Sequence, residues 1–258
     1  MKSHLPSSIY GPVESWRLGI SLGVDVLCVD SICSFECVYC QLGRINRVTK
    51  TRAVFVPTEK VLADLENADW PRADVITFSG SGEPTLAANL GEVIERIKLR
   101  THKPIVVLTN STLLYDPQVR RELYKADKIF CKLDAWSDAV LKRVDRPTEG
   151  VSLETIIAGI FQMRREFDGF LAIQTMILRP PNEFETEKLA EILYSIRPDE
   201  VQLNLPTRPV PKEYFLETRG NSVGFADGGA KIKTIPPAEL ENLRAKLSEL
   251  TKLQIITR

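Results

Sequence analysis

The sequence has no long apolar run and little histidine. No uninterrupted hydrophobic stretch approaches the roughly 20 residues that a membrane-spanning helix requires, so we expect no membrane span. Lys plus Arg total 34, as do Asp plus Glu, so no net charge attracts nucleic acid over the whole surface. The two histidines, His4 and His102, offer few nitrogen ligands to a metal ion.

Cysteine is scarce as well, with five residues in 258. An odd number of cysteines in a long chain, whose first residues lack the apolar run of a secretory signal, argues against a disulfide framework. We therefore expect reduced thiols and a cytoplasmic location. With 43% hydrophobic residues the chain can build one sizeable core, and a single domain is the default expectation.

Three of the cysteines lie in one short segment, where Cys33, Cys37 and Cys40 have the spacing C-x3-C-x2-C and Tyr39 precedes the last. Three thiols in one loop can converge on one face of an iron–sulfur cluster. No fourth cysteine lies nearby, so one iron would lack a protein ligand and stay open to another molecule. The pattern therefore favours a reactive cluster.

Zinc is the alternative for the same loop, with Cys28 or Cys131 as the fourth ligand that a structural zinc site needs. Both of these cysteines fall in apolar strand-like runs, however, where cysteine usually serves as a small buried hydrophobic residue. Two further cysteines are also too few for a second cluster. We therefore predict one cluster and keep zinc as the open alternative.

The cysteine loop resembles the signature of the radical S-adenosylmethionine (SAM) superfamily, C-x3-C-x-aromatic-C, with Tyr39 as the aromatic residue. The resemblance implies one [4Fe-4S] cluster whose open iron is chelated by SAM. It implies that the reduced cluster cleaves SAM to a 5′-deoxyadenosyl radical, which abstracts hydrogen from a substrate. It also implies a one-electron donor such as flavodoxin or ferredoxin as a partner.

Short β-branched runs alternate with amphipathic segments, which predicts parallel strands joined by helical crossovers. Six strands are expected at 21–29, 75–78, 105–109, 128–133, 170–178 and 201–205. Six units suit an open doubly wound sheet or a partial barrel, and the resemblance implies the α/β partial (β/α)6 TIM-like barrel. We expect a core with an N-terminal extension at 1–208 and a C-terminal extension, of loop, helix and short strand, packed on it at 209–258.

Ligands of α/β sheets bind beyond the carboxyl ends of the strands, and polar residues follow several of the expected ends. The run Ser79-Gly-Ser-Gly-Glu83 is similar to the GGE motif of the superfamily, which receives the SAM amino group. On its own the run also reads as a strand-to-helix turn. The residues expected to bind the cofactor are Tyr39, Gly80, Gly82, Glu83, Asn110, Asp134 and Gln174. Past them, Arg143 and Arg146 are candidates for the SAM carboxylate.

Longer runs around these motifs are similar to small stand-alone iron–sulfur oxidoreductases grouped with the wyosine tRNA-modification enzymes. The substrate expected from this likeness is a small metabolite or an RNA nucleoside. The alternative is an activase that generates a glycyl radical on a partner enzyme, and a non-enzymatic metal-sensing role is a remote third. A basic loop from Arg44 to Arg52 either binds phosphate, as in RNA, or a carboxylate-bearing substrate, or is simply solvated.

Overall fold

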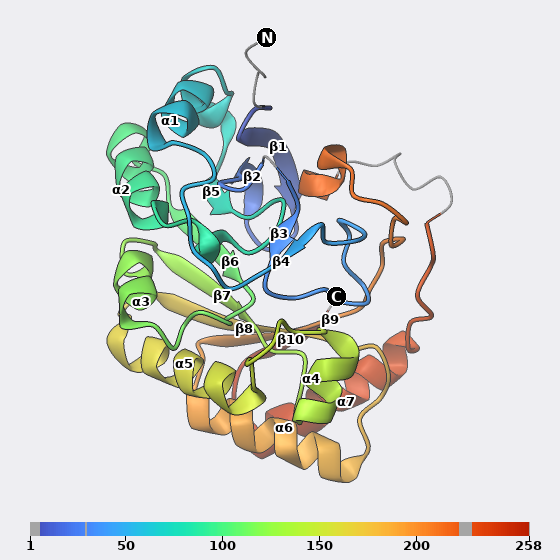
Figure 1. The fold of residues 1–258 in the computed structure, drawn as a ribbon. Helices are drawn as coiled ribbons and strands as arrows, with labels where there is room; N and C mark the ends of the chain where they lie inside the picture. The colour runs from blue at the N-terminus through green and yellow to red at the C-terminus, as the bar shows by residue number, and fades with distance from the viewer. Residues whose placement is uncertain (1–5, 29, 222–228, 258) are drawn as a thin grey trace.

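The computed structural model describes residues 6–28, 30–221 and 229–257, and its main element is an eight-stranded sheet (Figure 1). The strand order is β1-β2-β5-β6-β7-β8-β9-β10, and every neighbouring pair is parallel except β1 with β2. The strands of this sheet are β1 Ile9–Ser15, β2 Gly19–Val24, β5 Val75–Phe78, β6 Ile105–Thr109, β7 Lys128–Lys132, β8 Phe170–Met176, β9 Glu200–Asn204 and β10 Ile255–Thr257.

The six strands expected from the sequence are all present, in the order that right-handed crossovers produce. The first is shorter than expected, because the Asp25 carboxylate accepts a hydrogen bond from the Leu27 amide at 3.0 Å and turns the chain. The sequence did not indicate β1, in which Gly11 and Pro12 interrupt the strand pattern. It also missed a small parallel pair, β3 Ile32–Cys33 with β4 Arg47–Val48.

Helices cover the outer face of the sheet, as Figure 1 shows for α1 to α7. Their bounds are α1 Thr58–Glu66, α2 Leu90–Thr101, α3 Pro117–Leu123, α4 Asp138–Val144, α5 Leu153–Glu166, α6 Glu183–Ile196 and α7 Pro237–Thr251. Asp116 followed by Pro117 is the pattern of a capped helix start, and the cap is present, since the Asp116 side chain accepts from the Gln118 amide at 2.8 Å. No helix in the described part of the chain is long and apolar enough to cross a membrane.

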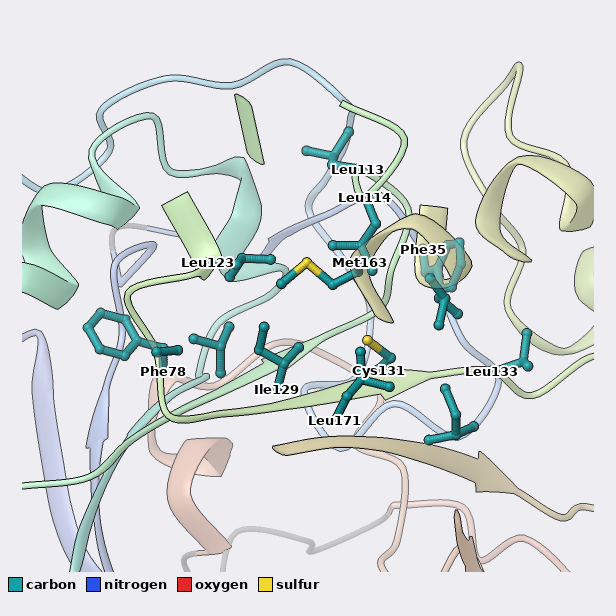
Figure 2. Close-up of a cluster of buried hydrophobic side chains, with 14 of the residues drawn as sticks. Phe35, Phe78, Leu113, Leu114, Leu123, Ile129, Cys131, Leu133, Met163 and Leu171 are labelled. Atoms are coloured by element: carbon teal, nitrogen blue, oxygen red, sulfur yellow. The ribbon is translucent and has the colours of Figure 1, made fainter. Parts of the chain in front are cut away.

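The core lies between the sheet and the helices. Figure 2 shows Ile129 and Cys131 of β7 packed against Leu123 of α3 and Met163 of α5. The intervening residue Phe130 points to the other face, where it joins a smaller apolar cluster with Val75, Val106 and Ala172. This alternation follows the two-residue period of a strand and leaves the inner face of the sheet for the functional site.

The two cysteines outside the loop are buried, with 2% of Cys28 and none of Cys131 exposed. Burial raises the pKa of the Cys131 thiol to about 12, so that it stays protonated. The C-terminal residues meanwhile continue the core, because β10 pairs with β9 and α7 packs against α6. The division of the chain at residue 208 remains a prediction.

The integration of α7 can be tested with two leucines on the same helix. Leu247 is fully buried, whereas Leu250 is 41% exposed. We expect Leu247→Ala to lower the free energy of unfolding by about 2–5 kcal/mol, because it leaves a cavity in the core. Leu250→Ala should change it by less than about 0.5 kcal/mol. Urea unfolding of the two variants measures the difference, and equal values would mean that α7 is not part of the cooperative core.

Candidate active site

The cysteine loop begins at Cys33 in β3 and is held by backbone hydrogen bonds from both sides. On one side, the Thr49 amide donates to the Cys33 carbonyl at 2.8 Å, next to the β3–β4 pairing. On the other side, the Val38 amide donates to the Val144 carbonyl at 2.9 Å, at the end of α4. The loop is therefore fixed between two segments that are far apart in the sequence.

Cys33, Cys37 and Cys40 form no disulfide, are partly exposed as residues, and line one cavity of about 460 Å³. Burial raises the pKa of Cys33 to about 12 and the pKa values of Cys37 and Cys40 above their ordinary range. Iron binds thiolates, so a metal at this site would have to displace three protons.

The arrangement of the thiols fits a cluster. In the described part of the chain, no three Cys, His, Asp or Glu side chains are grouped as one metal ion requires. A cluster makes no such demand, because each of its cysteine ligands binds a different iron. The zinc alternative would need Cys28 or Cys131, and both lie in the core rather than in the lining of the cavity.

Glu83 is buried in the wall of the same cavity and accepts several hydrogen bonds. Its donors are the Thr85 amide at 3.1 Å, the Thr85 hydroxyl at 2.5 Å, the Thr109 hydroxyl at 2.7 Å and the Asn110 amide at 2.6 Å. Burial raises the pKa of this carboxyl, and the hydrogen bonds oppose that effect. The turn after β5 is thereby joined to the end of β6.

Gly82 brings this turn against the cysteine loop. Its φ is +151°, and a Cβ atom there would lie 1.6 Å from the Ile32 carbonyl oxygen, so only glycine fits. The close approach lets Ile32 and Gly82 form a parallel bridge, with Cys33 and Glu83 next in the chain. The glycine in the sequence motif therefore places the carboxylate beside the first thiol.

The structure brings most of the predicted cofactor residues together around the cavity. Its lining includes Tyr39, Gly80, Gly82, Glu83, Asn110 and Gln174. The Asn110 side-chain amide lies 3.5 Å from the Cys33 sulfur. Asp134 is absent from that lining, since its carboxylate accepts from the Met176 amide at 2.8 Å and from the Tyr39 hydroxyl. Arg143 and Arg146 are exposed on the surface outside it.

Lys132, which sequence reasoning did not single out, lies at the centre of a buried network. Its ammonium is 2.7 Å from an Asp134 oxygen and also contacts Asp145. It lies 5.0 Å and 5.3 Å from the ring centroids of Phe35 and Tyr39, which both belong to the cysteine loop. No local motif links Lys132 to Asp145, so the sequence held no signal for this contact.

One ammonium faces two buried carboxylates in this network. Burial lowers the pKa of Lys132, but the two carboxylates outweigh it and raise that pKa well above its ordinary value. Burial raises the pKa of Asp145 to about 6. Lys132 therefore remains charged, and the second carboxylate holds a proton into the weakly acidic range.

A second buried ion pair joins the C-terminal segment to the glycine turn. Asp25 accepts from Arg219 at 3.0 Å and from the Ser81 hydroxyl at 2.6 Å. Tyr214 also bonds Ser81, with 2.8 Å between the hydroxyl oxygens. Arg219 belongs to the short helix Leu216–Asn221, which lies beside the N-terminal strands in Figure 1. The sequence did not indicate this connection.

A side-chain hydrogen bond also connects the turn between β1 and β2 to strand β9. Arg17, in the turn from β1 to β2, donates to the Gln202 side chain of β9 at 3.0 Å. Gln174 of β8 donates to the same Gln202 oxygen at 2.8 Å. Near the cysteine loop, Arg208 contacts Gln41. Arg17, Gln174, Arg208 and Gln41 all line the cavity, so these contacts form part of its wall.

Lys132→Met tests whether the ammonium holds the cysteine loop. The substitution leaves two buried carboxylates without their cation, so we expect the free energy of unfolding of the metal-free protein to fall by about 3–5 kcal/mol. The control is Lys128→Met on the same strand, where the ammonium lies over the Phe170 ring and no buried carboxylate depends on it. Denaturant unfolding of both variants measures the effect, and a similar loss in both would contradict the assigned role.

Comparison with known proteins identifies the family of the chain. Residues 29–193 match the family model described as "Radical SAM superfamily". The chain is 50% identical over 246 residues to UPF0026 protein slr1464 of Synechocystis sp., covering 93% of this chain and 92% of that protein.

Solved structures share the fold at low identity. One is a radical SAM methyltransferase from Sphaerobacter thermophilus, with TM-score 0.64, 16% identity and coverage of 92% of this chain and 65% of that chain. Another is Streptococcus suis SuiB bound to S-adenosylmethionine, with TM-score 0.61, 15% identity and coverage of 89% of this chain. The chain spans about half of SuiB, namely 48%. The chain belongs to the radical SAM superfamily, whose members are enzymes that use a [4Fe-4S] cluster and SAM.

Proposed function

We propose that Cys33, Cys37 and Cys40 hold the [4Fe-4S] cluster and that the neighbouring strand ends bind SAM. The observation that carries this proposal is that the three thiols share one cavity with Glu83 and Asn110. When bound, the reduced cluster and SAM supply the 5′-deoxyadenosyl radical that abstracts hydrogen from a substrate. The chain's own contribution is to position both groups and to keep water away from them.

Each proposed contact follows from a group that faces the cavity. The Glu83 carboxylate would accept from the SAM ammonium, because a buried carboxylate gains most from a cationic partner. Gly80 and Gly82 let the backbone approach SAM closely, and Asn110, Tyr39 and Gln174 offer polar atoms around it. Asp134 would contact SAM only if its bond to Tyr39 or to Lys132 opened.

A small metabolite is the substrate class that we propose. The hairpin between β1 and β2 is joined to β9 through Arg17 and Gln202, and Arg208 reaches Gln41 across the rim of the cavity. These contacts favour a small substrate. An activase would instead have to admit the glycine-bearing loop of a partner protein. An RNA nucleoside remains the second candidate, and the likeness to wyosine-related proteins stays a prediction.

The test compares two cysteine variants under anaerobic conditions. After reconstitution with iron and sulfide, the wild-type protein should show a cluster EPR signal that SAM perturbs, and should form 5′-deoxyadenosine on reduction. Cys37→Ala should lose cluster binding and reduce 5′-deoxyadenosine formation at least 100-fold, because only two of the three thiolates remain. Cys131→Ala, which removes a thiol buried in β7, should keep both.

Two results would contradict the proposal. One is formation of 5′-deoxyadenosine by Cys37→Ala at the wild-type rate. The other is a wild-type protein that binds zinc tightly, takes up no cluster and leaves SAM intact.

A further inference from the structure

We infer that a basic surface flanking the cysteine loop is the docking site of an acidic electron-carrier protein. This inference rests on the proposed function, since it concerns delivery of the electron to the same cluster. The carrier loses one electron on docking, and the cluster gains it. The argument uses six cations, here called the basic rim: Arg44, Arg47, Lys50, Lys142, Arg143 and Arg146.

The rim has two arms, one on each side of the cysteine loop. The first arm, residues 44–50, follows the loop and pairs with it where Arg47 lies opposite Ile32. The second arm, residues 142–146, contains the end of α4. Its Asp145 carbonyl accepts a hydrogen bond from the Glu36 amide at 3.0 Å. Both arms are thus bonded to the backbone that carries the thiols.

The first arm also reaches the segment that follows the second. A Cβ atom built on Gly150, just beyond the second arm, would lie 3.1 Å from the Lys50 ammonium. The three cysteine residues are partly exposed. Because both arms are bonded to the cysteine loop, a protein that covered both arms would also lie over that loop.

The rim is positive in a chain whose net charge is zero. In residues 6–28, 30–221 and 229–257, no ion pair involves any of its six cations. Within four residues of a rim cation, the acids in the chain are Asp138, Asp145 and Glu149, and Asp145 is directed inward to Lys132. The electrostatic field of these cations steers a negatively charged partner toward the cysteine loop.

Arg52, the last basic residue of the loop named from the sequence, is excluded from the rim. Its guanidinium donates to the carbonyl oxygens of Thr85 at 2.9 Å and Ala87 at 3.0 Å, and it pairs with Glu122. These bonds fasten the end of the loop to the segment after the glycine turn. Arg52 therefore serves the fold, whereas the rim cations that precede it form no ion pair in the described residues.

An acidic protein fits the rim better than RNA does. The rim cations do not line the cavity, whose exposed lining residues are Glu14, Trp16, Thr207 and Arg208. RNA held on the rim would thus lie away from the exposed lining. Neither arm contains an aromatic residue on which a base might stack. Electron-carrier complexes, by contrast, are small and weak and depend on complementary charge.

The test measures binding of an acidic flavodoxin to the cluster-loaded protein, by calorimetry at low ionic strength and over a salt series. The rim variant combines Arg44→Gln, Lys142→Gln and Arg143→Gln, whose side chains are exposed. The matched control combines Arg121→Gln, Lys246→Gln and Lys252→Gln, which are also exposed and lie on or beside the outer helices. A second rim variant, Arg47→Gln with Lys50→Gln, covers the possibility that the first loads cluster poorly.

We expect the Kd for flavodoxin to rise by roughly tenfold or more in either rim variant and to depend less on salt. Stopped-flow reduction by flavodoxin hydroquinone should slow in parallel, while 5′-deoxyadenosine formation driven by dithionite stays at the wild-type level. The control variant should behave as wild type. Dithionite-driven activity of the wild type tests the proposed function separately. A failure of flavodoxin docking is therefore distinguishable from a failure of the proposed function.

Two outcomes would overturn the inference. In one, flavodoxin binds and reduces the rim variants and the control equally well. In the other, the rim variants keep flavodoxin binding but lose salt-sensitive retention of RNA, which would assign the rim to nucleic acid.

Discussion

The position of the cysteine loop depends on a buried ammonium. Lys132 reaches from β7 to two carboxylates and lies between the rings of Phe35 and Tyr39, so that it ties the loop to the inner face of the sheet. Asp145 extends the same tie to the end of α4, where it is also within 3.6 Å of the Cys37 sulfur. A polar network of this kind is costly to bury and stabilises only one arrangement of its members.

The other side of the site depends on backbone geometry. Gly82 permits the turn after β5 to meet Ile32, which places Glu83 beside Cys33. The Asp25 carboxylate then holds this turn through Ser81 and connects it to Arg219. One continuous set of contacts thus joins the cysteine loop, the glycine turn and the C-terminal segment. We expect a substitution in any of the three to affect the positions of the other two.

The sequence predicted the local features of this site and missed the distant ones. Local patterns predict these features, because each depends on residues a few positions apart in the chain. They are the spacing of the cysteines, the strand ends and the cap at Asp116. The pairs Lys132 with Asp145 and Asp25 with Arg219 form only after folding brings separate elements together. Strand β1 was not predicted, because it contains a glycine and a proline, which are unfavourable in strands. Asp134, expected near the cofactor, accepts a hydrogen bond from the Tyr39 hydroxyl, and its contact with SAM stays a prediction.

The central claim is that the three thiols leave one iron open and that SAM occupies it. Electron–nuclear double resonance of the reduced cluster, with SAM labelled with ¹⁵N at its amino group, tests this directly. We expect a hyperfine coupling from the label that appears only when labelled SAM is bound. A reduced cluster without such a coupling, in a protein saturated with SAM, would contradict it.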